Sequence, residues 1–161
     1  MTGPVTLRPA TPGDLDLLTT LNLHLREDQG YAGGADEEPW VRERLRGWLT
    51  GVGVVGGPVS LAVFERDGEP LAFASWRLDD TGVYGRQLFV SRAHRREGLG
   101  RRAIDLLRQA FPGQALSLDV LLTNEPARAF YRALGFTESS VIMSLPALGG
   151  EPAQVPVAAS H

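Results

Sequence analysis

The chain has 161 residues and a mass of 17.4 kDa, enough for one domain that buries a core without disulfides or a metal. It contains no cysteine, which excludes disulfides, cysteine-ligated metal sites and an acyl-cysteine intermediate. A net charge of −3 argues against nucleic acid as a partner. No apolar run approaches the roughly 20 residues of a membrane-spanning helix, and no secretory signal is visible. We therefore expect a cytoplasmic protein with no membrane partner.

The first half of the chain predicts one strand, then two helices, then three strands. Thr11-Pro12-Gly13-Asp14 has helix-start chemistry, with a threonine cap, a proline at the first helical position and an acid three residues after the cap. Asp67-Gly68 predicts a hairpin turn, and the glycine-rich Gly51–Gly57 is interpreted as a surface loop rather than a phosphate cradle. The expected elements are a strand at Val5–Arg8, a helix carrying Leu15 to Leu25, a helix carrying Trp40 to Leu49, and strands at Val59–Glu65, Pro70–Leu78 and Val83–Val90.

The second half predicts alternating helices and strands. The expected elements are a helix at Leu99–Phe111, a strand at Leu116–Leu122, a helix at Pro126–Leu134 ended by Gly135, and a closing strand at Val141–Leu145. The fold class is α/β (α+β), in the order β-α-α-β-β-β-α-β-α-β, with a mixed central sheet and helices on both faces. Residues 1–145 form one domain, and residues 146–161, rich in Ala, Gly and Pro, form a loose tail.

A basic loop between a strand and a helix is the most informative segment. Gly98 and Gly100 lie where the helix begins, so backbone could approach a phosphate at the unpaired first-turn amides. Arg95, Arg96 and Arg101 can add positive charge. No Lys-Ser or Lys-Thr follows the glycines as in a Walker A loop, and the third glycine of a Rossmann fingerprint is missing. The alternative is a helix start with an exposed, arginine-rich face.

Two motifs together resemble the GNAT acetyltransferases. Arg95-x-x-Gly98-x-Gly100 is similar to the pyrophosphate motif of that family, and it follows a Leu-Phe-Val strand. Downstream, Leu118-Asp119-Val120 and then Asn124-x-x-Ala127-x-x-x-Tyr131-x-x-x-Gly135-Phe136 are similar to the strand, helix and Gly-Phe turn that close the family's cofactor site. The motifs span Leu88 to Phe136 in the order and separation of the family, whose element order fits Val5 to Leu145.

The resemblance implies acetyl-CoA as cosubstrate and no metal. It also implies that Val83–Val90 and Leu116–Leu122 are parallel neighbours that splay apart, so that the pantetheine arm can add between them like a strand. Glu97 should then point outward to solvent. The implied cofactor-binding residues are Leu88, Phe89 and Val90 for acetyl and pantetheine, and Arg95, Arg96, Glu97, Gly98, Leu99, Gly100 and Arg101 around the pyrophosphate.

Two downstream residues each allow two interpretations. Asn124 suits a helix cap before Glu125-Pro126, and the resemblance adds a contact to the pantetheine arm. Tyr131 suits the inner face of a short helix. The resemblance makes it the catalytic acid that protonates the departing thiolate, which a phenol of pKa near 10 can do if it is held at hydrogen-bond distance.

The general base and the acceptor are not identified by the sequence. Many relatives supply a glutamate from the strand before the phosphate loop, but Val83–Val90 contains no carboxylate. An ordered water, Glu27, Asp28 or Asp119 could substitute. Five acids in Arg26-Glu27-Asp28 and Asp36-Glu37-Glu38 would suit a cationic amine if they face the cleft, or they are solvated helix ends.

The leading hypothesis is an N-acetyltransferase that moves an acetyl group to a primary amine, on a small molecule or peptide, by direct transfer in a ternary complex. One alternative is a non-catalytic acyl-CoA-binding sensor on the same fold, which the missing strand carboxylate favours. Another is an anion-binding structural module. A homodimer is compatible with each of these.

Overall fold

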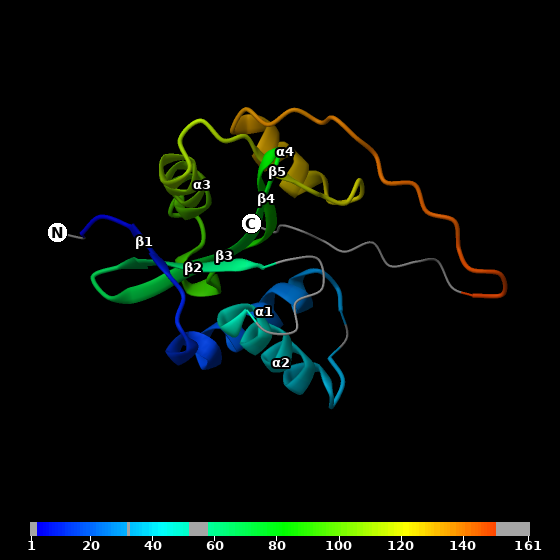
Figure 1. Cartoon of the computed structure of the whole chain (residues 1–161), viewed down its shortest axis with the longest axis horizontal. Helices are drawn as coiled ribbons and strands as arrows, with labels where there is room; N and C mark the ends of the chain where they lie inside the picture. Colours follow the sequence, from blue (N-terminus) through cyan, green and yellow to red (C-terminus); the bar gives the residue numbers. More distant parts are fainter. Residues whose placement is uncertain (1–2, 32, 52–57, 151–161) are drawn as a thin grey trace.

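A single five-stranded sheet forms the centre of the computed structural model, which describes residues 3–31, 33–51 and 58–150 (Figure 1). The strand order is β1-β2-β3-β4-β5. The pairs β1–β2, β2–β3 and β3–β4 are antiparallel, and the pair β4–β5 is parallel. This confirms the mixed sheet. The strands are β1 (Thr6–Pro9), β2 (Ser60–Arg66), β3 (Glu69–Asp79), β4 (Gly82–Val90) and β5 (Leu116–Leu118).

Helices cover both faces of the sheet, as predicted. One layer consists of α1 (Leu15–Asp28) and α2 (Glu37–Thr50), and the other of α3 (Leu99–Ala110) and α4 (Glu125–Ala133) (Figure 1). Short 3-10 turns, η1 (Pro12–Asp14) and η2 (Arg92–His94), precede α1 and the basic loop. The predicted capping chemistry is present at η1, where the Thr11 N–H donates to Asp14 at 2.8 Å. Hydrogen bonds from Arg8 lower the pKa of Asp14 to about 2.

Each helical layer buries its own apolar core against the sheet. Leu18, Leu25 and Leu45 of α1 and α2 pack with Phe73 and Phe89 on one face. On the other face, the helices α3 and α4 pack against a second set of strand residues; this core includes Ala103, Ile104, Ala127, Phe64, Ala74, Val83, Leu88 and Val90. Burial of apolar area is the main favourable term in folding. The two cores therefore fix the position of the sheet between the two helical layers.

A β-bulge interrupts the pairing of β3 with β4. Ser75 lies opposite Gln87, but Trp76 lies opposite Gly85, so Arg86 is an extra residue in β4. The bulge changes the in–out alternation of the strand. As a result Val83 faces the same core as Leu88 and Val90, although it is odd-numbered.

Two predicted strands differ from the structure. The strand expected at Leu116–Leu122 ends at Leu118, because the chain turns away and the Asn124 N–H donates to the Leu121 carbonyl at 2.9 Å. The closing strand expected at Val141–Leu145 is wrong, since the segment forms no ladder and Met143 is 91% exposed. Strand formation depends on a neighbour to pack against, and this segment has none in the part of the chain that the structure describes.

The predicted boundary of the domain at residue 145 stays a prediction. Residues 146–150 are exposed, and the rest of the predicted tail lies outside the described residues. The same holds for the predicted loop at 51–57, of which only Gly51, the left-handed end of α2, is described. Among the described residues, no helix combines the length and apolar character that crossing a membrane would need.

Candidate active site

The strands β4 and β5 pair only at their beginnings. Their register runs from Val83–Leu116 to Gly85–Leu118, and no β5 residue lies opposite the remainder of β4. The predicted splaying of two parallel strands is therefore present. Residues Leu88, Phe89 and Val90 lie beyond the last paired residue and are held on their other side by β3. The backbone on this side of β4 can accept a further extended chain.

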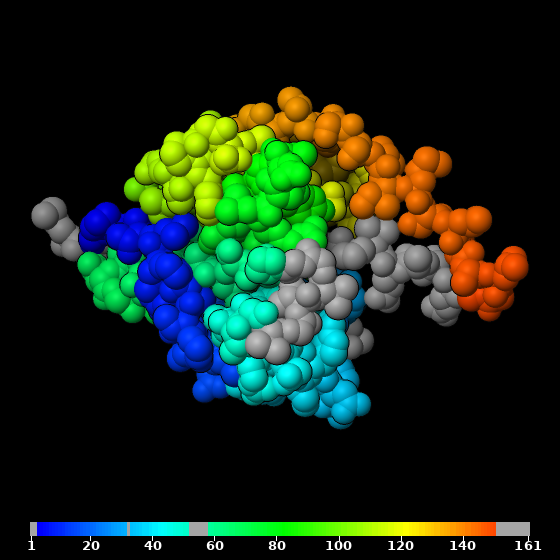
Figure 2. All heavy atoms as spheres, viewed as in Figure 1, coloured from blue at the N-terminus to red at the C-terminus, as the bar shows by residue number. Residues whose placement is uncertain are grey.

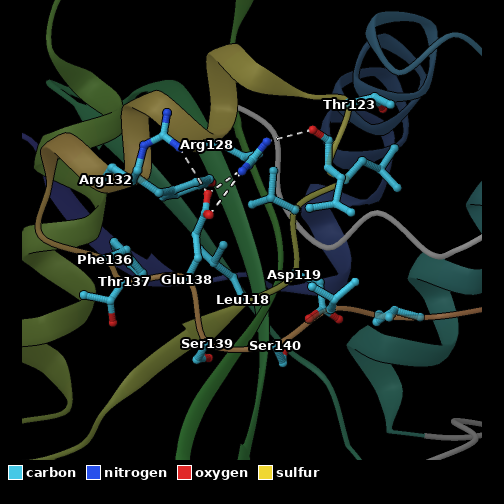
Figure 3. Close-up of a pocket in the computed structure, with 16 residues that line it drawn as sticks. Leu118, Asp119, Thr123, Arg128, Arg132, Phe136, Thr137, Glu138, Ser139 and Ser140 are labelled. Carbon is cyan, nitrogen blue, oxygen red and sulfur yellow. Dashed lines mark hydrogen bonds and ion pairs between the residues drawn. The ribbon is translucent and has the colours of Figure 1, made fainter.

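A cavity of about 760 Å³ lies against the end of β5 and the loop that follows it. Figure 2 shows a hollow beside the green strands, with the orange segment after α4 along its rim. The lining comes from β5 and the loop after it, from α4, and from residues 136–142 (Figure 3). A cavity of this size is within the usual range for a small-molecule or cofactor site.

Tyr131 presents the most unusual polar atom of this cavity. Its side chain is only 3% exposed, and its hydroxyl is buried without a hydrogen-bond partner among the described residues. Burial raises the pKa of the Tyr131 phenol well above 10, so the hydroxyl keeps its proton at neutral pH. A buried, unpaired donor is costly, and a ligand atom in the cavity could satisfy it. Its role as a proton donor to a coenzyme sulfur stays a prediction.

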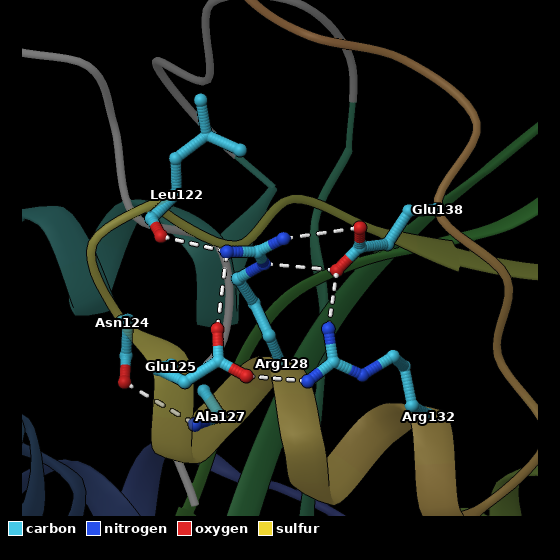
Figure 4. Close-up of polar contacts among 7 residues, drawn as sticks. All are labelled: Leu122, Asn124, Glu125, Ala127, Arg128, Arg132 and Glu138. Atoms are coloured by element: carbon cyan, nitrogen blue, oxygen red, sulfur yellow. Dashed lines mark hydrogen bonds and ion pairs between the residues drawn. The ribbon is translucent and has the colours of Figure 1, made fainter.

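An ion-pair network joins α4 to the segment that closes the cavity (Figure 4). The Arg128 Nε donates to Glu138 at 2.8 Å and its Nη1 donates to the Leu122 carbonyl at 3.0 Å. Arg132 also donates to Glu138, at 3.2 Å, and pairs with Glu125. The bond from Arg128 lowers the pKa of Glu138. Sequence reasoning missed this network, whose only signal was the spacing of charges along α4.

Asn124 has the capping role that was one of its two interpretations. Its side-chain oxygen accepts from the Ala127 N–H at 3.3 Å, which satisfies a first-turn amide of α4. The residue is partly buried and directly follows Thr123, which lines the cavity. The contact to a pantetheine arm stays a prediction.

The basic loop leads into α3 through two left-handed residues, Arg96 (φ 66°) and Gly98 (φ 73°). The first intrahelical hydrogen bond of α3 runs from the Arg102 N–H to the Gly98 carbonyl at 3.1 Å. The amides before it belong to Leu99, Gly100 and Arg101 and have no helical acceptor, so they form the anion-attracting end of the helix.

The two glycines of the motif serve different purposes. A Cβ at Gly98 would meet nothing within 4 Å, and its positive φ is the feature that favours glycine. A Cβ at Gly100 would lie 2.9 Å from the Phe130 ring. Gly100 is therefore required for close packing of α3 on α4, a reason that the motif alone did not reveal.

The charged residues of the loop divide into two groups. Arg96 and Arg101 are exposed and form no ion pair within the described residues. Arg95 instead pairs with Asp28 at 2.5 Å and donates to the Val90 carbonyl at 3.4 Å, which ties the loop to α1. Glu97 is exposed, and its carboxylate contacts Arg66 and His94.

None of the three candidate bases is a free carboxylate. Glu27 pairs with Arg92 at 2.9 Å. Burial alone would raise the pKa of Asp28, but hydrogen bonds from Arg95 and Arg92 outweigh it and lower the pKa. Asp119 accepts a hydrogen bond from the Tyr84 hydroxyl; burial and this bond raise the pKa of Tyr84 to about 12.

The position on β4 nearest the cofactor residues carries an amide in place of a carboxylate. The Gln87 Oε1 accepts from Asn22 at 3.1 Å and from Ser75 at 3.2 Å. Both donors are fully buried. Sequence reasoning noted the missing carboxylate but did not find these partners, because they come from α1 and β3.

Comparison with known proteins agrees with this architecture. The profile of the acetyltransferase (GNAT) family matches residues 21–136. A possible acetyltransferase from Clostridium difficile 630 superposes with a TM-score of 0.72 at 17% identity, over 89% of this chain and 97% of that one. A predicted acetyltransferase from Clostridium acetobutylicum, solved with acetyl-CoA, gives 0.63 at 17% identity, over 88% and 96%. An aminoglycoside 6'-N-acetyltransferase from Acinetobacter haemolyticus gives 0.63 at 17% identity, over 89% and 98%.

These structures share the fold of a mixed sheet with helices on both faces. No curated protein matches the sequence. The chain belongs to the acetyltransferase (GNAT) family.

Proposed function

We propose that this protein is an acetyl-CoA-dependent N-acetyltransferase that acts on a primary amine by direct transfer in a ternary complex. The observation that carries the proposal is the end of pairing between β4 and β5 at Gly85–Leu118, next to a cavity that Leu118 and Tyr131 both line, with the buried Tyr131 hydroxyl lacking a partner among the described residues. The gap supplies backbone groups for an amide-bearing arm, and the hydroxyl supplies a proton at the same place. The related structure solved with acetyl-CoA supports this cosubstrate.

The binding residues divide by chemistry. Leu88, Phe89 and Val90 offer backbone groups to the acetyl and pantetheine portions. The first-turn amides of α3, together with Arg96 and Arg101, supply the positive potential that would attract a pyrophosphate. Because Arg95 is occupied by Asp28, its contribution is to hold the loop in place rather than to bind phosphate directly.

The reaction then needs three events. The amine nitrogen attacks the thioester carbonyl, and a backbone N–H of Leu88 to Val90 stabilises the oxyanion that forms. The C–S bond breaks and the thiolate leaves. It takes the proton of the Tyr131 hydroxyl, while the nitrogen loses a proton to solvent or to a base; a proton from solvent then restores the Tyr131 hydroxyl. An alkyl amine of pKa about 10.4 must also be deprotonated first, which costs about 4–5 kcal/mol at neutral pH.

The second candidate is a non-catalytic acyl-CoA sensor. It is favoured by the absence of a carboxylate on β4 and by the ion pairs that occupy Glu27 and Asp28. A structural module that binds only an anion is the third candidate. The three differ in whether acetyl-CoA binds and whether it is consumed.

The test measures binding and turnover on the same preparation. Acetyl-CoA should raise the melting temperature, since a ligand that binds only the folded state stabilises it by mass action. Free thiol should then appear with a panel of primary amines above the rate without amine. The chain has no cysteine, so the protein adds no thiol to this readout. Binding without amine-dependent thiol release would favour the sensor, and no binding would overturn both.

A further inference from the structure

Arginine and aromatic side chains alternate across the layer of α1 and α2. The guanidinium of Arg44 lies 4.5 Å from the ring centre of Trp40 and 4.9 Å from that of Trp48. The guanidinium of Arg26 lies 4.8 Å from the ring centre of Trp40, and that of Arg86 lies 5.6 Å from the ring centre of Trp48. We call these five residues, together with Tyr31 at 4.3 Å from Arg26, the arginine–aromatic stack.

The stack carries more positive charge than its surroundings neutralise. Arg26 pairs with Glu37 at 2.6 Å. Within the described residues, no carboxylate pairs with Arg44 or Arg86. Arg44 donates to the Asn22 amide oxygen at 3.0 Å, and its Nε is buried without a partner. Burial, followed by repulsion from Arg26 and Arg86, lowers the pKa of Arg44 to about 10.

Cation–π contacts do not replace a counter-ion. Each such contact is weak compared with the desolvation cost that a buried cation without a charged partner keeps. Burial and the nearby Arg77 also lower the pKa of Arg86. An anion placed between Arg44 and Arg86 would remove both penalties. Trp40 is 49% exposed, so this part of the stack reaches the surface.

The stack is connected to the proposed reaction site through β4. Arg86 is the bulge residue, one position after the last pairing of β4 with β5. From Arg44 a chain of hydrogen bonds continues through Asn22 to Gln87, which directly precedes the cofactor residue Leu88. In a regular strand Arg86 and Gln87 would face opposite sides, but at the bulge both contact the layer of α1 and α2.

We propose that the acceptor amine carries an anionic group, a carboxylate or a phosphate, which is bound by Arg44 and Arg86. The inference rests on the proposed acetyltransferase function and names its class of acceptor. Guanidinium groups suit this task because their fixed N–H donors match both anions. The anion would be held on the α2 side of β4, and the amine would extend past the bulge toward Leu88.

The acidic residues near this layer do not favour a cationic acceptor. Glu27 and Asp28 are paired with Arg92 and Arg95, and Glu38 is paired with Arg42 at 3.2 Å. With Glu37 held by Arg26, four of the five acids considered from the sequence already have a cation. Of the five, only Asp36, at the start of α2, has no ion pair within the described residues, and Arg44 and Arg86 have none either.

The first experiment compares amines that differ only in charge. Thiol release from acetyl-CoA is measured with 4-aminobutyrate and with its neutral amide, 4-aminobutanamide, and with 3-aminopropyl phosphate and 1,4-diaminobutane. We expect kcat/KM to be about 10- to 100-fold higher for an anionic amine than for the neutral amide, the range of a charge-assisted hydrogen-bonded contact. The two anionic amines separate carboxylate from phosphate.

The second experiment removes each cation. Arg86→Gln and Arg44→Gln should raise KM for the preferred anionic amine about 10-fold or more and leave KM for 4-aminobutanamide unchanged. Arg86→Lys should recover part of the loss because it retains the charge. Arg46→Gln is the matched control. Arg46 lies on α2 like Arg44, but it is paired with Glu43 and is not part of the stack. Melting temperatures with acetyl-CoA identify any variant that fails to fold.

The outcomes separate the two proposals. If neutral or cationic amines are acetylated as well as anionic ones, or if Arg86→Gln lowers kcat/KM equally for 4-aminobutyrate and 4-aminobutanamide, the anionic acceptor is wrong and the acetyltransferase stands. If acetyl-CoA binds but none of these amines, nor any amine of the wider panel, is consumed, the proposed enzyme itself fails. A preference for anionic amines that disappears in Arg86→Gln and returns in Arg86→Lys supports the assignment.

Discussion

The two sides of β4 use different chemistry. Toward α3 and α4, the proposed cofactor side consists mainly of backbone: the unpaired edge of β4, the first turn of α3 and the left-handed Gly98. Toward α1 and α2, the proposed acceptor side consists of side chains, with Arg44, Arg86 and the tryptophans around them. Backbone sites constrain glycines at fixed spacing and leave a sequence motif. Side-chain sites assembled from distant elements leave none.

The largest effect is expected at Gly98, on the backbone side. Gly98→Asp places a negative charge at the first turn of α3, where like-charge repulsion should weaken acetyl-CoA binding by about 10²-fold or more. Gly98→Asn is the matched control, because asparagine has nearly the same shape and tolerates the left-handed backbone. The measurement is the melting-temperature shift across an acetyl-CoA titration. Equal affinity in Gly98→Asp and wild type would show that no phosphate lies there.

Tyr131 tests whether the backbone side also contains the one essential side chain. Tyr131→Phe keeps the ring and should lower kcat on the order of 10²-fold, with little change in acetyl-CoA affinity. Stability should not fall, because the lost hydroxyl has no hydrogen-bond partner among the residues that the structure describes. Turnover is measured by thiol release under conditions in which chemistry limits the rate. An unchanged kcat there would leave Tyr131 with a packing role alone.

The carboxylates near the site should have smaller effects. Glu27→Gln, Asp28→Asn and Asp119→Asn should each lower turnover by less than about 10²-fold, since each carboxylate is already engaged and Asp28 has a lowered pKa. With an alkyl amine the rate should still rise with pH toward the amine pKa of about 10.4. A collapse of turnover in just one of these variants, with acetyl-CoA binding retained, would identify that residue as the base.

The smallest effect is expected at Gly100 and should appear in stability rather than binding. Gly100→Ala brings a methyl group toward the Phe130 ring and should cost about 1–2 kcal/mol of unfolding free energy. Phe130→Leu in the same chain should recover part of this loss, which denaturant titration can measure. Equal stability of Gly100→Ala and wild type would mean that the ring moves aside without cost.

The sequence predicted the elements whose signals are local. Thr11, Asn124 and Gly135 mark helix ends through capping and turn chemistry, and the apolar runs of β2 to β4 match strands that are buried on both faces. The family resemblance located Tyr131 and the glycine loop, and the structure brings Tyr131 into the wall of a cavity beside the splayed strands.

The remaining features depend on contacts between distant segments. The closing strand at Val141–Leu145 was expected from its apolar residues, but its formation needed a neighbour that the short β5 does not provide. The bulge at Arg86 depends on the register of β3 against β4. Likewise, the pairing of Arg95 with Asp28 and the arginine–aromatic stack join α1, α2 and β4. No spacing within one segment encodes such contacts.

The bulge at Arg86 has a consequence for how related enzymes can diverge. The extra residue is absorbed between Gly85 and Gln87, so the strand resumes its pairing with β3 on either side. A change of side chain at position 86 can therefore be accommodated without displacing the backbone of Leu88 to Val90. In the acceptor site proposed above, selection could then act on the choice of acceptor at this one position while the transfer chemistry is inherited unchanged.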